Sequence, residues 1–409
     1  MTAGPAARPP TAAAVPNVRR FLVGQGISNV GTFFQIVAQS LLVLDLTGSG
    51  LALGAAMGVQ FLPMLFFGPL AGVAIDRVRI PRLLTVTALC AGAEALTLGL
   101  LTSTGHINVA WILSLSFLLG MVQVADRSAA QVFLTELVER PLLPSAVGLS
   151  AVAQSVGRLG GPALAAGLYA WKGAAPCFYF NAASYVAVVV SLLVLRRDEL
   201  IPRQPVPREP GQLRDGLRFA WRSPLLRTVL LANAAIGMLT FNFPAFYSSL
   251  VKLTFHGGAT GFGVAESLNA ITAVLGGFFL ARRLHHPTMR LMALGCALLG
   301  VSMLWSAISP TLGLFLAGMP FFGAVVVVYT TVTQSLLQQH TPAEKQGRIM
   351  SLYMLGTMGT TPIGGLITGW ITDQWSPRAS LAVAGFTPLV CAAVVLTRSN
   401  ALRPTALAG

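Results

Sequence analysis

The chain has 409 residues, of which 54% are hydrophobic and 10% are charged, and its formal net charge is +14. A soluble protein of this length could not bury so much apolar surface, which excludes soluble enzymes and soluble binding domains. Apolar segments of about 20 residues, long enough to cross a bilayer core, recur along the chain. We predict twelve spans, at 19–44, 51–75, 82–104, 107–133, 144–171, 174–196, 225–250, 258–281, 287–308, 311–337, 347–372 and 379–397.

The basic residues follow the topology of these spans. If the chain starts inside the cell, 22 of the 27 lysines and arginines lie on the cytoplasmic side, the bias that membrane proteins show. Lys172, Lys252 and Arg378 fall outside, and Arg127 and Arg158 lie within spans. We therefore expect both termini in the cytoplasm, a place in the inner (cytoplasmic) membrane, and no nucleic-acid partner.

A polar stretch near the middle divides the spans into two halves of six. Its proline-rich start should be extended, and its end, LRDGLRFAWRS, is expected to form a basic helix on the inner leaflet. The predicted domains are a disordered cytoplasmic tail at 1–17, an N-terminal six-helix bundle at 18–197, a cytoplasmic linker at 198–223, a C-terminal six-helix bundle at 224–397 and a cytoplasmic tail at 398–409.

The two halves look like weak internal repeats. GVAIDR at 72–77 resembles GFFLAR at 277–282, and Pro162 in the fifth span matches Pro362 in the eleventh. Paired bundles with a binding site at their interface are a common plan of secondary transporters. The predicted fold class is therefore an all-α integral membrane protein with twelve transmembrane helices in two six-helix bundles.

The loop after the second span combines a glycine, an acid and several bases: Gly72, Asp76, Arg77 and Arg82. Such groups can form charge-assisted hydrogen bonds between helix ends, and an acid can face the positive end of a neighbouring helix. The second-half copy has Ala281 in place of the acid, so only the first half should form a strong latch. The alternative is that these arginines only set the topology.

The fifth span carries Gly148, Gly157, Gly161 and Pro162. Small residues let two helix backbones approach closely in a membrane, and a proline removes one hydrogen bond of the helix. The pattern predicts a helix that packs tightly and bends, as in a protein that alternates between two shapes. By spacing alone, ordinary helix packing remains an equal alternative.

These features resemble the major facilitator superfamily, and the chain is most similar to its transmembrane secretion effector branch, which includes enterobactin and macrolide exporters. The resemblance covers nearly the whole chain after residue 18. It implies that Asp76 and Arg77 form a gating latch between the second and eleventh helices. It also implies that the fifth helix carries the antiporter signature, although Ala165-Ala166 replaces the usual Gly-Gly. The stretches that carry it are GPALAAGLYA, FNAASYVAVV, LRDGLRFAWRSPLLR and LLQQHTPAEKQGRIMSLYMLGTMGTTPIGGLITG.

Uncharged polar side chains gather in the first, seventh and tenth spans, which line the central cavity in the superfamily. Neutral hydrogen-bonding groups among Phe and Met would suit a bulky, mostly apolar ligand with a few polar groups. Hydrogen bonding between helices is the alternative role for each of them. The cavity-lining candidates are Gln25, Asn29, Gln35, Gln39, Asn233, Asn242, Tyr329, Thr333 and Gln334.

Carboxyl groups inside the spans are candidates for proton coupling, because a low dielectric favours their neutral form. Glu266 is the first candidate, since it lies well inside the eighth span, and Asp126 and Glu94 are the others. Arg127 and Arg158 are the charged partners expected within spans, and a structural pair of Glu94 with a buried arginine is the alternative for that acid. The superfamily's usual arginine at the outer start of the fourth helix is missing, and Trp111 lies near that place.

Several function classes are excluded by absences in the sequence. There is no Gly-x-x-x-x-Gly-Lys-Ser/Thr loop, no metal-ligand spacing among the five histidines and no nucleophile motif. We therefore expect no enzyme activity, ATP, metal or other cofactor, with the proton gradient as the energy source.

The predicted function is secondary active export of a small amphipathic or hydrophobic compound (a drug, antibiotic, siderophore or other secondary metabolite) by a monomer, through proton antiport and alternating access. The partners are then the substrate, protons and the lipid bilayer. An importer or a lipid flippase of the same fold, and a non-transporting membrane sensor, are the alternatives.

Overall fold

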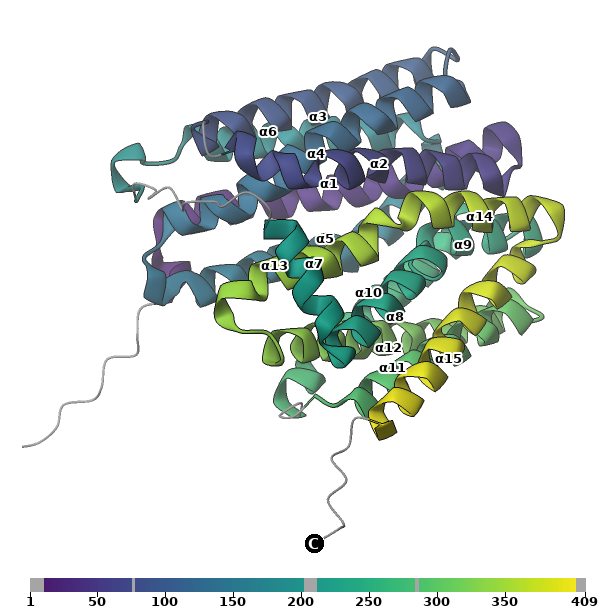
Figure 1. Cartoon of the computed structure of the whole chain (residues 1–409). Coiled ribbons are helices and arrows are strands. Elements are labelled where there is room, and N and C mark those ends of the chain that lie inside the picture. The colour runs from purple at the N-terminus through teal and green to yellow at the C-terminus, as the bar shows by residue number, and fades with distance from the viewer. Residues whose placement is uncertain (1–10, 76–77, 202–211, 284–286, 402–409) are drawn as a thin grey trace, which may run out of the picture.

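The computed structural model describes residues 11–75, 78–201, 212–283 and 287–401, and this part of the chain is helical without strands (Figure 1). Short 3-10 turns lie at Ala12–Ala14, Arg140–Leu142 and Arg197–Glu199. The long helices of the first half are α1 (Pro16–Thr47), α2 (Gly50–Ile75), α3 (Ile80–Ser103), α4 (Val109–Leu137), α5 (Leu143–Lys172) and α6 (Ala175–Leu193).

The second half begins with a short helix and contains two interrupted segments. Its elements are α7 (Gln212–Arg222), α8 (Pro224–Leu239), α9 (Phe243–Ser249), the π-helical turn η4 (Leu250–Thr254), α10 (Gly258–Arg283), α11 (Met289–Ile308), α12 (Leu312–Gln339), α13 (Ala343–Met354), the π-helical turn η5 (Leu355–Gly359), α14 (Thr361–Gln374) and α15 (Pro377–Ala401).

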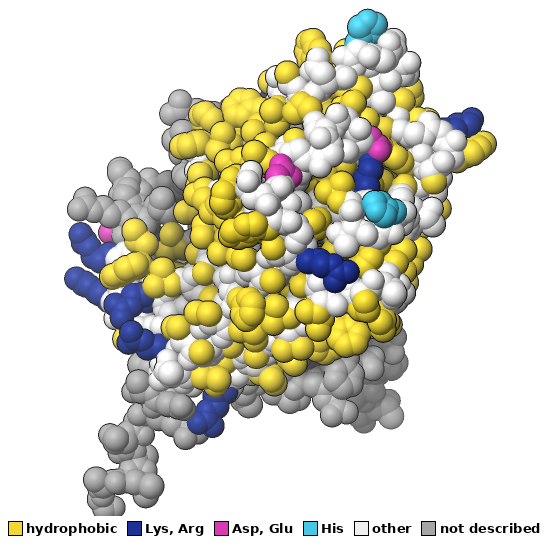
Figure 2. Space-filling view, turned by 90° about the vertical axis from the view of Figure 1, so that its right-hand side faces the viewer, with side chains coloured by type: hydrophobic (Ala, Val, Ile, Leu, Met, Phe, Trp, Pro, Cys, Tyr) yellow, Lys and Arg dark blue, Asp and Glu magenta, His cyan; other side chains and the backbone are white. Residues whose placement is uncertain are grey.

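Nine helical segments among the described residues are long and apolar enough to cross a membrane. Three further long segments, α5, α10 and α13–η5–α14, pack among them. Hydrophobic side chains cover much of the face shown in Figure 2, and charged side chains occupy only a few places on it. The predicted all-helical membrane architecture is confirmed, whereas twelve crossings, the domain boundaries and cytoplasmic termini stay predictions.

Local sequence explains where several helices begin and end. Asn108 accepts a hydrogen bond from the backbone N–H of Trp111 and so caps the start of α4. Thr288 and Thr311 cap α11 and α12 in the same way. Helix α1 ends at Gly48, whose φ of 63° lies in the left-handed region that glycine adopts without strain.

The predicted seventh and eleventh spans are interrupted helices. The seventh leaves the helical path at residues 240–242 between α8 and α9, and the eleventh contains η5 between α13 and α14. Side chains near these places bond the backbone of another segment: Thr240 Oγ1, at the first interruption, donates to the Ala384 carbonyl of α15 at 2.8 Å, and Asn233 Nδ2 of α8 donates to the Tyr353 carbonyl, just before η5, at 3.0 Å. In the first half, α1 and α5 hold the corresponding places and run without a break.

The two halves approach most closely where α2 packs on α14 (Figure 1). A Cβ atom added to Gly365 would lie 2.8 Å from the Gly54 carbonyl oxygen, and one added to Gly58 would lie 3.1 Å from the Pro362 Cα. Backbone therefore meets backbone along this contact, the close approach that small residues permit between membrane helices.

A second contact between the halves joins α5 and α10, where Gly263 packs against Pro162 and Ala166. Both contacts lie toward the end of the molecule that carries the α1–α2 and α14–α15 turns. Toward the other end of α5, Val147 and Val152 are exposed. The halves are thus closed against each other at the end that the predicted topology places outside.

The predicted basic helix between the halves is α7, and it is attached to the start of α13. The Lys345 ammonium lies 4.3 Å from the centre of the Phe219 ring, and Arg348 is 3.8 Å from Asp215. Leu217 and Trp221 are exposed on α7. The helix is confirmed, and its contact with the inner leaflet stays a prediction.

Gly31→Leu should destabilise the first half. A Cβ at Gly31 would collide with Ser184 and Asn181 of α6. The Asn181 Oδ1 atom would lie only 2.6 Å from it. Overpacking of this kind costs about 1–3 kcal/mol. We expect a lower melting temperature of the detergent-purified protein by fluorescence-detected gel filtration. Gly167→Leu is the control, because a Cβ there meets no atom within 4 Å; equal melting temperatures of the two variants would contradict the packing described for α1 and α6.

Candidate functional site

A polar cavity lies inside the first half, between α1, α2, α4 and α6. Its empty volume is about 440 Å³, part of which is open to solvent. The apolar part of its wall includes Leu53, Met57 and Leu119. Charged side chains are absent from the described lining, so the wall offers neutral donors and acceptors. The polar lining residues are Thr32, Gln35, Gln39, Ser40, Gln60, Gln123, Asn181 and Tyr185.

A buried hydrogen-bond network holds one side of this cavity. Gln35 Nε2 donates to both carboxyl oxygens of Glu94, at 3.2 and 3.1 Å. Asn181 Nδ2 donates to Gln35 Oε1 at 2.6 Å, and Ser184 donates to Asn181 Oδ1 at 3.2 Å. On the next turn of α1, Gln39 donates to Ser116 Oγ at 2.9 Å. Because Gln35 and Asn181 are each bonded through both ends of the amide, these side chains are fixed in place at the cavity.

Glu94 is the acid of this network and is 6% exposed. Within the described residues it makes no ion pair with a basic side chain, so the pairing with a buried arginine considered from the sequence is not seen there. Gln35 is its link to the cavity, because Gln35 lines the cavity and bonds the carboxyl group at the same time. A buried acid without a basic partner is costly to ionise, so such a group is suited to exchange a proton.

Asp126 and Arg127 lie on α4 and have different surroundings. Thr87 Oγ1 donates to Asp126 Oδ1 at 2.7 Å, which ties α4 to α3. Arg127 Nη2 donates to Gln123 Oε1 at 3.3 Å, and Arg127 Nη1 reaches Met358 Sδ in η5 at 3.5 Å. Arg127 therefore spans from a residue of the cavity wall to the second half.

Glu266 lies on α10 at the contact between the halves. One of its oxygens, Oε1, is buried without a hydrogen-bond partner among the described atoms, whereas Asn269 hydrogen-bonds the carboxyl group. Arg158 of α5 acts on it electrostatically from beyond ion-pair distance and is itself exposed. The acid and Arg158 thus come from opposite halves, close to Gly263 and Pro162.

The cavity-lining candidates of the second half bond one another and the backbone. Besides its bond to the Tyr353 carbonyl, Asn233 Nδ2 donates to Thr357 Oγ1 at 3.0 Å, and Asn233 Oδ1 accepts from the Tyr329 hydroxyl at 3.4 Å. Thr333 bonds the Tyr329 carbonyl, and Gln334 donates to the Tyr353 hydroxyl at 3.2 Å. In this conformation Asn233, Tyr329 and Gln334 connect helices, the alternative role considered from the sequence, whereas Thr333 bonds only the backbone of its own helix α12 among the described residues.

Asn242, at the break of the seventh segment, donates to the Met238 carbonyl at 3.0 Å, and its Oδ1 is buried without a partner among the described atoms. Gln25 and Asn29 of α1 are half-buried. Neither of these two borders the polar cavity of the first half.

The glycines of α5 meet α1 at two of the three predicted positions. Gly157 lies against Asn29, and a Cβ on Gly161 would lie 2.7 Å from Phe33 Cβ. Pro162 is buried toward α10, whereas Gly148 has no neighbouring atom within 4 Å of an added Cβ. Helix α5 therefore packs on α1 with one face and on the second half with the other.

The two central residues of the predicted gating latch are not among the residues that the structure describes. Asp76 and Arg77 lie outside the described residues, Gly72 lies near the end of α2, and Arg82 is exposed on α3. The latch therefore stays a prediction.

Sequence reasoning did not assign Gln60, Gln123, Asn181 and Tyr185 to a cavity, although all four line it. Each is a polar residue inside an apolar span, which was a usable signal. Asn181 and Tyr185 are four residues apart and so share one face of α6, the spacing that singled out Gln35 and Gln39 on α1.

Comparison with known proteins gives a consistent result. The family model described as transmembrane secretion effector matches residues 14–406. The multidrug efflux pump Tap of Mycolicibacterium fortuitum is 24% identical over 394 residues, covering 93% of this chain and 95% of that protein. The macrolide efflux protein A of Streptococcus pyogenes is 22% identical over 385 residues, covering 93% of this chain and 95% of that protein.

Solved structures share the fold at low identity. A bacterial homologue of the human lysosomal transporter Spinster, in an inward-facing and unoccupied conformation, has a TM-score of 0.76 and 13% identity, with 96% of this chain and 98% of that chain covered. The nucleoside transporter NupG has a TM-score of 0.70 and 12% identity, with 94% and 98% covered. The helical bundle with an internal polar cavity thus has the fold of membrane transporters rather than enzymes, and the chain belongs to the transmembrane secretion effector family of the major facilitator superfamily.

Proposed function

We propose that this transporter exports a small amphipathic or hydrophobic compound across the cytoplasmic membrane, driven by proton entry, through alternating access. Export is supported by the family and by the relatives that are named as multidrug and macrolide efflux proteins. The observation that carries the proton coupling is the buried carboxyl group of Glu94, bonded by a residue that lines the polar cavity.

The proposed coupling between proton and substrate depends on the Gln35 amide, which bonds the Glu94 carboxyl group and also lines the cavity. When Glu94 is ionised, the Gln35 Nε2 group is held by the carboxylate, as in the observed geometry. When Glu94 binds a proton, the charge-assisted bond is weakened and the Gln35 amide is no longer fixed in the orientation that it presents to a ligand in the cavity. Proton and substrate therefore act on the same side chain, and binding of one lowers the affinity for the other, as antiport requires.

The energy of one proton is sufficient for useful export. A proton crossing about 100 mV releases about 2.3 kcal/mol, which supports more than a tenfold gradient of a neutral substrate. The neutral amides and hydroxyls of the cavity suit a ligand with a few hydrogen-bonding groups on an apolar body.

Direction and coupling are tested in everted membrane vesicles that carry an imposed proton gradient, acid inside, and a fluorescent pH indicator. Addition of an exported compound from a panel of amphipathic dyes and antibiotics should dissipate the gradient, and a protonophore should abolish accumulation of the compound. A compound that leaves the vesicles as protons leave would instead indicate import, and accumulation that persists with the protonophore would rule out proton antiport.

Glu94→Gln keeps the size and hydrogen bonding of the side chain but removes its titration. We expect loss of proton-driven accumulation and a substrate affinity that no longer changes with pH, because the protonation step is removed. Glu139→Gln, an exposed acid beyond the end of α4, is the matched control. Glu266→Gln is measured in parallel: intact coupling in Glu94→Gln together with loss in Glu266→Gln would transfer the role to Glu266.

Gln35→Ala and Gln39→Ala should differ in their kinetics. Loss of Gln35 removes a bond to a charged group, so we expect about a tenfold higher KM together with a changed pH dependence of transport. Gln39 bonds only the neutral Ser116 hydroxyl among the described side chains, so its loss should raise KM and leave the pH profile unchanged. Identical pH profiles for both variants and the wild type would argue that the Gln35 amide does not link Glu94 to the ligand.

A further inference from the structure

Helix α2 receives its N-terminal cap from the other half of the molecule. Asp373, at the end of α14, accepts hydrogen bonds from the Ser49 hydroxyl at 2.5 Å, from the Gly50 N–H at 2.6 Å and from the Leu51 N–H at 3.2 Å. The first N–H groups of a helix lack partners within the helix, and a carboxylate is favoured at this positive end. The closed arrangement of the halves therefore satisfies groups that α2 cannot satisfy alone.

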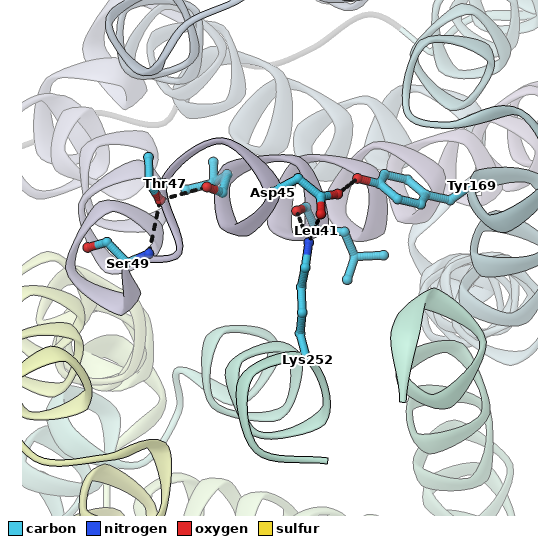
Figure 3. Close-up of polar contacts among 7 residues, drawn as sticks. Leu41, Asp45, Thr47, Ser49, Tyr169 and Lys252 are labelled. Atoms are coloured by element: carbon cyan, nitrogen blue, oxygen red, sulfur yellow. Dashed lines mark hydrogen bonds and ion pairs between the residues drawn. The ribbon is translucent and has the colours of Figure 1, made fainter. Parts of the chain in front are cut away.

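A second set of contacts joins the halves near the end of α1 (Figure 3). Lys252, in the π-helical turn η4, donates to the carboxyl group of Asp45 and, at 3.1 Å, to the Leu41 carbonyl. The Tyr169 hydroxyl of α5 donates to the other oxygen of Asp45. An ammonium group is favoured at the negative end of a helix, so Lys252 is stabilised by the last turns of α1 as well as by Asp45.

Asp45, Tyr169, Lys252 and Asp373, with the α2 N-terminus, form what we call the outer clamp. Both of its parts connect α1, α2 or α5 of the first half with η4 or α14 of the second. It lies at the opposite end of α2 from the latch predicted around Asp76 and Arg77. The two devices would thus favour closure at opposite ends of the molecule.

The elements that carry the clamp in the second half adjoin interruptions of their helices. Lys252 lies in η4, beyond the break at 240–242, and Asp373 lies on α14, beyond η5. π-helical turns and breaks are places where a helix bends easily. Motion of α9–η4 or α14 relative to α8 or α13 would separate Lys252 and Asp373 from the first half.

We propose that the outer clamp stabilises the outward-closed state and is released in each cycle when α14 and η4 move away from α1 and α2. This proposal rests on the alternating access proposed above. The two parts of the clamp are unequal. The Asp45 side chain is 48% exposed, so its ion pair is weakened by water and salt. Asp373 is exposed as well, but it accepts three bonds at a helix end, so its release is the larger step.

The test measures outer accessibility without substrate. In a variant with Cys90, Cys177, Cys296 and Cys391 replaced by alanine, Ser249→Cys is the reporter, because Ser249 is 3% exposed in a small cavity between α2, α9 and α14. Intact cells are treated with a membrane-impermeant maleimide. Adding Asp373→Asn should raise the labelling rate about tenfold, and Asp45→Asn should raise it less.

Asp198→Asn is the matched control, because Asp198 is an exposed acid of a 3-10 turn distant in sequence from the clamp, and it should leave labelling unchanged. Labelling of Asp373→Asn at the control rate, in protein of normal membrane abundance, would overturn the proposal. Since this readout requires neither substrate nor protons, it separates failure of the clamp from failure of proton-coupled export.

A second measurement covers the case in which Asp373→Asn does not reach the membrane. The double variant Ser49→Cys/Asp373→Cys places two thiols where Ser49 and Asp373 are in contact. Oxidation should cross-link α14 to the start of α2, hold the outer end closed and stop labelling at Ser249→Cys, and a reductant should reverse this. A cross-linked protein that labels as fast as the reduced one would refute the clamp.

Discussion

The structure depends on one constraint: a polar group inside the hydrocarbon region must find a partner within the protein. In continuous helices the backbone meets this demand by itself, so only side chains need partners across helices. Gln35, Asn181 and Glu94 supply these to one another in the first half. Where the eleventh segment forms a π-helical turn, the Asn233 side chain supplies a donor to the backbone carbonyl of Tyr353.

The two halves therefore use polar residues differently. The first half keeps its long helices intact and uses its amides to enclose a cavity next to a buried acid. The second half uses Asn233, Tyr329 and Thr357 to support interrupted helices. The first half is thus suited to hold a ligand, and the second half contains the interrupted segments, which can bend.

Much of the fold could be predicted from the sequence, because hydropathy, the basic loops and the glycines of α5 are local signals. The pairing of Gln35 with Glu94 could not, because the two residues are 59 positions apart and their depths in α1 and α3 depend on packing. Asn233 and Tyr329 are residue types that also line cavities, and their bond to each other depends on how α8 packs on α12. Asp45 and Asp373 look like ordinary charges at span ends, and the closed arrangement of the halves gives Asp45 its cationic partner Lys252 and Asp373 its N–H partners on α2.

Helix α1 connects the two sites that we propose act in transport. It carries Gln35 beside the buried acid and, ten residues later, Asp45 in the outer clamp, so the two lie about 15 Å apart along one continuous helix. Because α1 also packs on Gly157 and Gly161 of α5, a change in its tilt at one site must shift the other. A rigid helix of this kind provides a physical route by which protonation of a buried carboxyl group alters the stability of the outer closure, with no need for contact between substrate and clamp.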